Sequence, residues 1–223
     1  MCGRYSLTKA EMRMATRFSQ QEKLNLVDRP RFNVAPTQAA PVILNLDGSA
    51  QVCTLRWGLL PRWSKTLLVN AQSETAAQKP SFKESFASRR CLIPADGFYE
   101  WKTQGRLKRP MHFVLKSAEV FCFAGIWEPA PEGDRFLLFT TTPNSLVAEC
   151  HRRMPAILHP ADYDLWLDPA SNTVDLQATL RPYEADLMSG TFVSDRVNDV
   201  RNDSAACLEP SEPVSTNLEL FPG

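Results

Sequence analysis

The sequence lacks a net charge, because its 25 Lys and Arg residues balance its 25 Asp and Glu residues. No global positive field therefore attracts nucleic acid, although a local basic patch is enough for a site-specific binder. The sequence also lacks any apolar run approaching about 18 residues, and no apolar segment follows its start. These absences predict a protein that has no membrane partner and resides in the cytoplasm. The sequence does not report an oligomeric state, and a monomer is the plain expectation.

Two cysteine patterns are absent as well. None of the six cysteines forms a CxxC pair, so zinc-ribbon and thioredoxin-like sites lose their basis, and neither a metal nor a cofactor is predicted. Four cysteines sit in or beside apolar runs, as in Phe121-Cys122-Phe123, which is typical of buried reduced thiols. Glycine is scarce, with 9 residues against 17 prolines, which favours fixed irregular loops over flexible linkers.

Strand-like apolar runs dominate the remaining pattern, with scattered helices and no strand–helix–strand alternation. We therefore predict an α+β fold of one domain with a mainly antiparallel sheet. Residues 31–36 are expected to form a fixed loop, and residues 207–223, with no Lys or Arg, a loose tail after a domain of residues 1–206. The expected strands are 42–46, 52–57, 67–71, 91–94, 111–115, 120–127 and 136–142.

Capping signals predict the helices. Thr8 with Glu11 resembles a capping box that opens a helix to Phe18, and Ser81 with Glu84 opens another to Ser88. Pro160 suits the first position of a helix through Trp166. Further helical segments are expected at 144–150, for one or two turns, and at 173–180.

Cys2 is the residue with the most distinctive chemistry. Removal of Met1 leaves an α-amine with a pKa of about 8 beside a thiol with a pKa of about 8.5. Such an aminothiol traps an aldehyde first as a Schiff base and then as a five-membered thiazolidine. Chain termini are mostly disordered, however, so an incidental terminal cysteine is the competing interpretation.

Two later blocks offer partners for this chemistry. Asn70 to Thr75 follows a strand-like run, where polar side chains have a rigid mount, although an ordinary helix cap explains the block equally well. Glu100 lies between aromatic residues, and burial there would raise the pKa of a carboxyl group toward neutrality. On local grounds alone, an exposed strand Glu flanked by core aromatics is the favoured interpretation. Trp101 is suited to stacking on a base or to packing in the core.

Basic residues occur in two further places. His151 precedes Arg152 and Arg153, which combines a proton shuttle with phosphate-binding groups. The segment from Lys102 to Arg109 carries four cations, which suit either a solvated turn or the flank of a nucleic-acid groove.

Taken together and in order, these blocks resemble the SRAP domain family over about residues 1–203. The resemblance rests on an N-terminal Cys, a strand-end Asn, a Glu-Trp pair and a His-Arg-Met-Pro block in that order. The matching segments are Met1-Cys2-Gly3-Arg4, Arg31-Phe32-Asn33-Val34-Ala35-Pro36, Arg56-Trp57-Gly58-Leu59-Leu60-Pro61, Asn70 to Thr75, Cys91 to Trp101, His151-Arg152-Arg153-Met154-Pro155 and, more weakly, Val197-Asn198 with Val200-Arg201-Asn202.

The resemblance implies the SRAP fold, with a barrel-like core and short flanking helices, and a covalent reaction with DNA. Such proteins bind single-stranded DNA and crosslink to the aldehyde of an abasic site. Cys2 would form the thiazolidine, Asn70 would hold Cys2 and the sugar, Glu100 would transfer protons, and His151 would protonate the sugar oxygen. A DNA-binding role is implied for Arg4, Asn33, Trp63, Gln72, Trp101 and Arg153, with phosphate contacts for the two arginines.

The family is also associated with lyase-like chemistry, with DNA repair and the SOS response, and with a thiol autopeptidase activity that removes Met1. Two positions depart from the family pattern, because Gln72 replaces a common Arg and Arg152 replaces a frequent Asp. Losing a cation at position 72 removes an expected phosphate contact, and phosphate contacts set DNA affinity.

Two other functions remain compatible with these residues. The Cys2 thiolate would serve equally as the nucleophile of an N-terminal-nucleophile hydrolase or thiol peptidase acting on a separate substrate. A protein that coats single-stranded DNA without chemistry would need only the basic and aromatic groups. Turnover of an amide supports the first alternative, and binding that is insensitive to Cys2→Ala supports the second.

Overall fold

The structure is a computed structural model that describes residues 2–14, 16–18, 23–61 and 65–211. Its larger sheet follows the order β13-β12-β6-β5-β8-β11-β14, and β7 also pairs with β12. Since β11 pairs with β12 as well, the strands β12, β6, β5, β8 and β11 close into a ring. The bounds are β5 Ala39–Leu46, β6 Ser49–Trp57, β7 Asn70–Gln72, β8 Arg90–Ala95, β11 Phe121–Glu128, β12 Arg135–Thr141, β13 Met154–Pro155 and β14 Ile157–Leu158.

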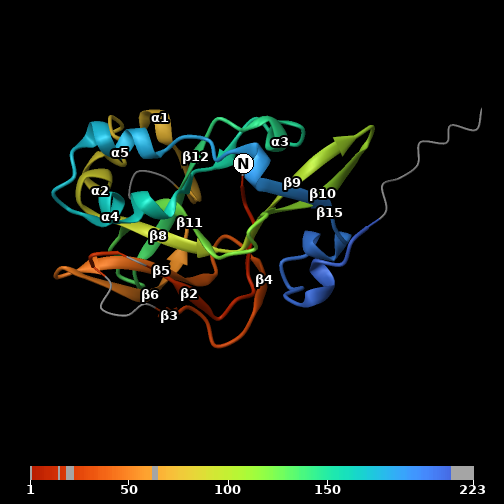
Figure 1. Ribbon diagram of the computed structural model, residues 1–223, viewed down its shortest axis with the longest axis horizontal. Coiled ribbons are helices and arrows are strands. Elements are labelled where there is room, and N and C mark those ends of the chain that lie inside the picture. Colours follow the sequence, from red (N-terminus) through yellow and green to blue (C-terminus); the bar gives the residue numbers. More distant parts are fainter. Residues whose placement is uncertain (1, 15, 19–22, 62–64, 212–223) are drawn as a thin grey trace, which may run out of the picture.

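A smaller sheet with the order β15-β10-β9-β1-β4 lies beside this ring (Figure 1). Its strands are β1 Tyr5–Leu7, β4 Arg31–Val34, β9 Gly97–Gln104, β10 Leu107–Leu115 and β15 Met188–Phe192. Within the described chain, the pairings are antiparallel except those of β12 with β6 and β7. The predicted α+β fold with a mainly antiparallel, barrel-like core is therefore confirmed.

Short helices flank the ring, and α1, α2, α4 and α5 gather on one side of the molecule (Figure 1). The predicted helices are confirmed at 83–88, 145–148, 160–167 and 173–179, although Ser81 caps nothing because the N-cap position is Phe82. None of the described helices has the length and apolarity needed to span a membrane. The helices are α1 Ser73–Ala76, α2 Lys83–Ser88, α3 Ser145–Ala148, η1 Pro160–Asp162, α4 Tyr163–Leu167, α5 Thr173–Thr179, η2 Ala185–Leu187, η3 Asp195–Asn198 and η4 Ala205–Cys207.

The N-terminal strand is anchored in the core by an aromatic cluster. The ring of Tyr5 in β1 is fully buried and lies 5.3 Å from that of Trp57 and 5.8 Å from that of Phe123, centroid to centroid. Full burial of one side chain the size of Phe123 contributes about 1.5–3 kcal/mol to folding. This packing anchors the N-terminal segment to both sheets. Cys2, three residues before Tyr5, is therefore held in place although it lies near the chain terminus.

The predicted helix from Thr8 to Phe18 is wrong. Residues Glu11–Arg13 form strand β2, which pairs with β3, Lys23–Asn25, and only the middle residue Met12 is buried. The Thr8 hydroxyl donates a 2.6 Å hydrogen bond to Asp96, which comes from β8–β9, instead of capping a helix. Burial in this segment therefore alternates with the two-residue period of a strand. The Thr8 hydroxyl, which was expected to cap a helix, is bound instead to a carboxylate that is distant in sequence.

The predicted loop at 31–36 is also wrong in its first four residues, which form β4. This strand pairs with β1, where Tyr5 lies opposite Val34. Its backbone amides at Phe32 and Asn33 donate to the carboxylate of Asp203, at 2.6 and 3.0 Å. The predicted strand at 67–71 is shifted, because β7 spans Asn70–Gln72.

The tail is ordered for longer than predicted. Cys207 is fully buried, Val193 bridges to Pro210, and the Ser211 hydroxyl donates to the Val193 carbonyl at 2.9 Å. The expectation of a loose segment is therefore corrected for residues 207–211. Residues 212–223 lie outside the described part of the chain.

Candidate active site

Cys2 is held by Asn70, which lies 68 residues away in the sequence. The Asn70 side-chain amide donates a 2.8 Å hydrogen bond to the Cys2 carbonyl oxygen. Asn70 is the first residue of β7 and pairs with Leu138 of the closed ring, so its backbone is rigidly placed. The structure thus brings together two of the four side chains predicted to carry the chemistry.

The side-chain oxygen of Asn70 indicates where a ligand group could bind. Its Oδ1 atom is buried and has no hydrogen-bond donor within the described residues. A buried carbonyl oxygen without a donor costs about 1–3 kcal/mol, and such groups are uncommon in folded proteins. An oxygen held in this state beside Cys2 is placed to accept a hydrogen bond from an amine.

Glu100 and His151 line one cavity of about 490 Å³ together with Trp101, Lys108 and Asn198. Glu100 is 3 % exposed and lies on β9 opposite Met111. Burial first and then the charge of Glu100 raise the pKa of the Cys2 thiol, so the thiol and the carboxyl group interact electrostatically. The predicted catalytic residues therefore belong to one site.

The Glu100 carboxyl group titrates near neutrality. Burial raises its pKa to about 7, as its aromatic setting predicted. A group with this pKa exchanges a proton at low cost in either direction at physiological pH, which suits general acid–base chemistry.

His151 is oriented by the backbone that follows it. Its Nδ1 atom lies 3.1 Å from the Arg153 amide nitrogen and 3.2 Å from the Arg153 carbonyl oxygen, so both backbone groups of Arg153 hold the ring by this edge. Burial lowers the pKa of His151, and the charges of Arg152 and Arg153 act in the same direction. The lowered pKa favours the neutral ring at pH 7.

The two arginines predicted to contact phosphates are both bound to protein acceptors. Arg4 donates to Asn33 Oδ1 at 2.9 Å and to the Val197 carbonyl at 2.5 Å. Arg153 forms a two-pronged ion pair with Glu74, with N···O distances of 2.6 and 2.8 Å. Their phosphate role stays a prediction, and in this structure each guanidinium fixes the loops around the site.

Asn33 is fully buried and joins β4 to the segment that follows η3. Its side-chain NH₂ group donates to the carbonyls of Val197, Asp199 and Asn202, at 3.2, 3.1 and 2.8 Å. Since its oxygen accepts from Arg4, every polar atom of this amide has a protein partner. Asn33 thus holds the wall of the cavity, where Asn198 lies.

We expect Asn33→Ala to lower the free energy of unfolding by about 2–3 kcal/mol, because it leaves buried carbonyls without a donor. Urea denaturation measures this loss. Asn172→Ala is the matched control: this asparagine is exposed and caps α5, and its loss should cost about 1 kcal/mol. An Asn33→Ala protein as stable as the control would contradict the role assigned to Asn33.

The remaining predicted DNA-binding residues differ in their placement. The Trp101 indole lines the cavity and donates to Asn198 Oδ1 at 2.7 Å. Gln72 is exposed at the end of β7 and is not among the residues that line the cavity. Trp63 lies outside the described residues.

Sequence reasoning missed three residues of this site. Asn198 orients Trp101, Lys108 lines the cavity, and Glu74 pairs with Arg153. The signals were present but weak, in the Val197-Asn198 pair and in the basic segment from Lys102 to Arg109. No group of three or more His, Cys, Asp or Glu in the described residues is placed to hold a metal ion.

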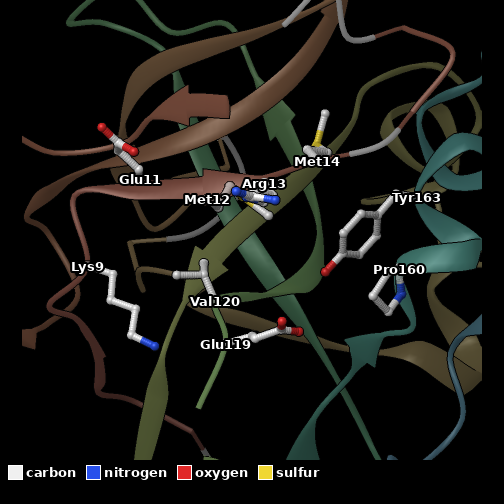
Figure 2. A pocket seen from close by; sticks show the side chains of 9 residues that line it. All are labelled: Lys9, Glu11, Met12, Arg13, Met14, Glu119, Val120, Pro160 and Tyr163. Atoms are coloured by element: carbon white, nitrogen blue, oxygen red, sulfur yellow. The ribbon is translucent and has the colours of Figure 1, made fainter. Parts of the chain in front are cut away.

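A second cavity, of about 390 Å³, shares no lining residue with the first (Figure 2). Its lining carries two cations and two anions around apolar side chains, so it presents no positive field to DNA. The hydroxyl of Tyr163 on its wall already accepts a hydrogen bond from the Cys122 amide at 3.1 Å. The lining residues are Lys9, Glu11, Met12, Arg13, Met14, Glu119, Val120, Pro160 and Tyr163.

Comparison with known proteins gives matches over most of the chain. The profile of the family described as SOS response associated peptidase (SRAP) matches residues 1–200. Abasic site processing protein YoqW of Bacillus subtilis is 39% identical over 222 residues, covering 94% of this chain and 99% of that protein. Abasic site processing protein HMCES of Gallus gallus is 30% identical over 265 residues, covering 95% and 78%. The crystal structure of a Bacteroides thetaiotaomicron protein superposes with a TM-score of 0.72 at 26% identity, covering 82% and 86%.

Proposed function

The chain belongs to the SRAP family, and on this premise we propose that it processes abasic sites in single-stranded DNA by forming a covalent crosslink through Cys2. Relatives that match nearly its whole length are named abasic site processing proteins. The observation that carries the proposal is the site around Cys2: Asn70 holds its carbonyl, and Glu100 interacts with its thiol.

The reaction begins with removal of Met1, which frees the Cys2 amine. The amine adds to the aldehyde carbon of the ring-opened deoxyribose, and the resulting carbinolamine loses water to give an imine. The Cys2 sulfur then bonds to the imine carbon, and the thiol hydrogen passes to the imine nitrogen. The product is a thiazolidine, and the only species released from the two reactants is one water molecule.

The side chains around Cys2 suit these steps. Asn70 Oδ1, buried without a donor, accepts a hydrogen bond from the amine and keeps it directed at the aldehyde. The imidazole of His151, whose Nδ1 edge is held by Arg153, donates a proton to the sugar oxygen as the ring opens. Glu100, with a pKa of about 7, takes a proton from the amine and returns it to the departing hydroxyl group.

The thiol favours this reaction over a thiol peptidase. Burial raises the pKa of Cys2, so the sulfur carries its proton at neutral pH. A peptidase nucleophile needs a lowered thiol pKa to provide thiolate. Thiazolidine closure needs no free thiolate, because the imine is already a strong electrophile and the thiol proton ends on nitrogen.

A denaturing gel tests the proposal. Purified protein is mixed with a single-stranded oligonucleotide that carries one abasic site, and we expect a slower band that survives heating. An oligonucleotide with a tetrahydrofuran in place of the abasic sugar has no aldehyde and should give no such band. Intact mass spectrometry of the protein should show loss of Met1, and absence of the slower band would overturn the proposal.

A further inference from the structure

Most basic side chains near the cavity are already engaged by other groups of the protein. Arg4 and Arg153 bind the acceptors described above, and Lys102 forms a 2.7 Å ion pair with Glu149. Arg109 is 8 % exposed and lies against the ring of Phe192, 4.7 Å from its centroid. Groups committed in this way are poor candidates for the contacts that hold a DNA strand.

Lys108 differs from these cations in both exposure and surroundings. It lies near the start of β10 opposite Thr103, is exposed, and lines the same cavity as Glu100 and His151. No described carboxylate forms an ion pair with it. Its ammonium charge is therefore available to a phosphate at the cavity.

Arg152 is the second such cation. It is exposed, it directly follows His151, and within the described chain it has no ion-pair partner. Its charge contributes to lowering the pKa of His151, so its field reaches the cavity. Because its neighbour Arg153 is paired with Glu74, the backbone that carries Arg152 is held in place, and the Arg152 side chain is exposed.

The acidic groups around the cavity do not cancel these two charges. Glu74 is paired with Arg153, Glu149 with Lys102 and Asp199 with Arg201. Glu100 is the one carboxyl group among the lining residues, and it is buried. Asp195 accepts a 3.4 Å hydrogen bond from the lining residue Asn198, and its single charge offsets only one of the two cations. Lys108, which lines the cavity, and Arg152, which directly follows the lining residue His151, therefore leave a local positive charge at this site on a chain with no net charge.

On the premise of the proposed function, we propose that Lys108 and Arg152 hold the phosphates of the DNA strand at this cavity, in place of Arg4 and Arg153. Arg152 would supply at this edge of the site the charge that Gln72 does not. The two cations come from different elements: Lys108 of β10 lines the cavity, and Arg152, in the turn after α3, directly follows the lining residue His151. Each contact would release counterions from the strand, which makes binding depend on salt.

The test is the salt dependence of binding to an oligonucleotide without an abasic site, so that no crosslink interferes. Fluorescence anisotropy gives the dissociation constant from about 50 to 200 mM KCl, and each phosphate contact on a single strand contributes about 0.7 to the slope of log K against log salt. Lys108→Ala and Arg152→Ala should each lower the slope by about this amount and weaken binding about 5-fold at 0.1 M salt. Arg152→Lys should retain the slope.

Lys116→Ala is the matched control, because Lys116 is an exposed cation just beyond the far end of β10, about 26 Å from Lys108 at the usual strand rise. Its slope should equal that of the unaltered protein. Unchanged slopes for both Lys108→Ala and Arg152→Ala, or an equal loss in Lys116→Ala, would overturn the inference. The gel with abasic DNA is run alongside: a protein that crosslinks but shows no change in slope refutes this inference alone, whereas one without a crosslink refutes the proposed function.

Discussion

Cys2→Ala is expected to abolish the heat-stable product with abasic DNA while leaving an imine that borohydride can trap. Alanine keeps the α-amine but has no sulfur, so the reaction stops before the ring closes. Asn70 should still hold the backbone at this position, because its 2.8 Å hydrogen bond goes to the carbonyl oxygen of residue 2 and not to the side chain. The variant therefore separates the two bonds that the proposal assigns to Cys2.

Cys2→Ser extends the same experiment. Its hydroxyl closes the corresponding ring less favourably than a thiol, so the heat-stable band should again be lost, and borohydride should restore a band in both variants. Mass spectrometry must show that each variant has lost Met1, because alanine and serine are small enough for that removal. A heat-stable band of normal yield in Cys2→Ala, without reductant, would refute the thiazolidine.

Glu100→Gln is expected to slow crosslinking by about 10²–10⁴-fold, the usual contribution of a general acid–base group. The reactive state of the site carries one proton shared between the amine, with a pKa of about 8, and Glu100, with a pKa of about 7. Below pH 7 both groups are protonated, and above pH 8 neither is. The crosslinking rate should therefore be highest between about pH 7 and pH 8. Because the two groups interact, the two apparent pKa values describe the pair and not the separate residues.

The pH profile distinguishes this role from mere packing. In Glu100→Gln only the amine titrates, so the rate should rise with pH and level off above about 8, without the alkaline fall of the unaltered protein. Single-turnover rates from about pH 5 to 10 measure both curves. Glu149→Gln, which alters an exposed carboxylate paired with Lys102, is the control and should keep the peaked profile. A peaked profile in Glu100→Gln would contradict the proton-transfer role.

Local sequence patterns correctly predicted the strands in which nearly every residue is buried. In β8 all six residues are buried, and the apolar runs of β11 and β12 likewise gave strands where they were expected. The helix from Thr8 failed because its cap pairs with Asp96, and β4 was missed because Asp203 supplies the acceptor for its amides. Both errors come from side chains far away in the sequence, which no local pattern contains.

The sequence by itself determined which residues meet the needs of the chemistry: an aminothiol at Cys2, an amide at Asn70, a carboxyl group at Glu100 and an imidazole at His151. Only the tertiary structure decided which hydrogen-bond and ion-pair partners these groups and their neighbours have. The charge of an arginine is fixed by its covalent structure, but the partners of Arg4 and Arg153 depend on which acceptors the fold brings within hydrogen-bond distance. For the same reason only the fold shows that Lys108, on the cavity lining, and Arg152, next to His151 in the sequence, have no ion-pair partner among the described residues.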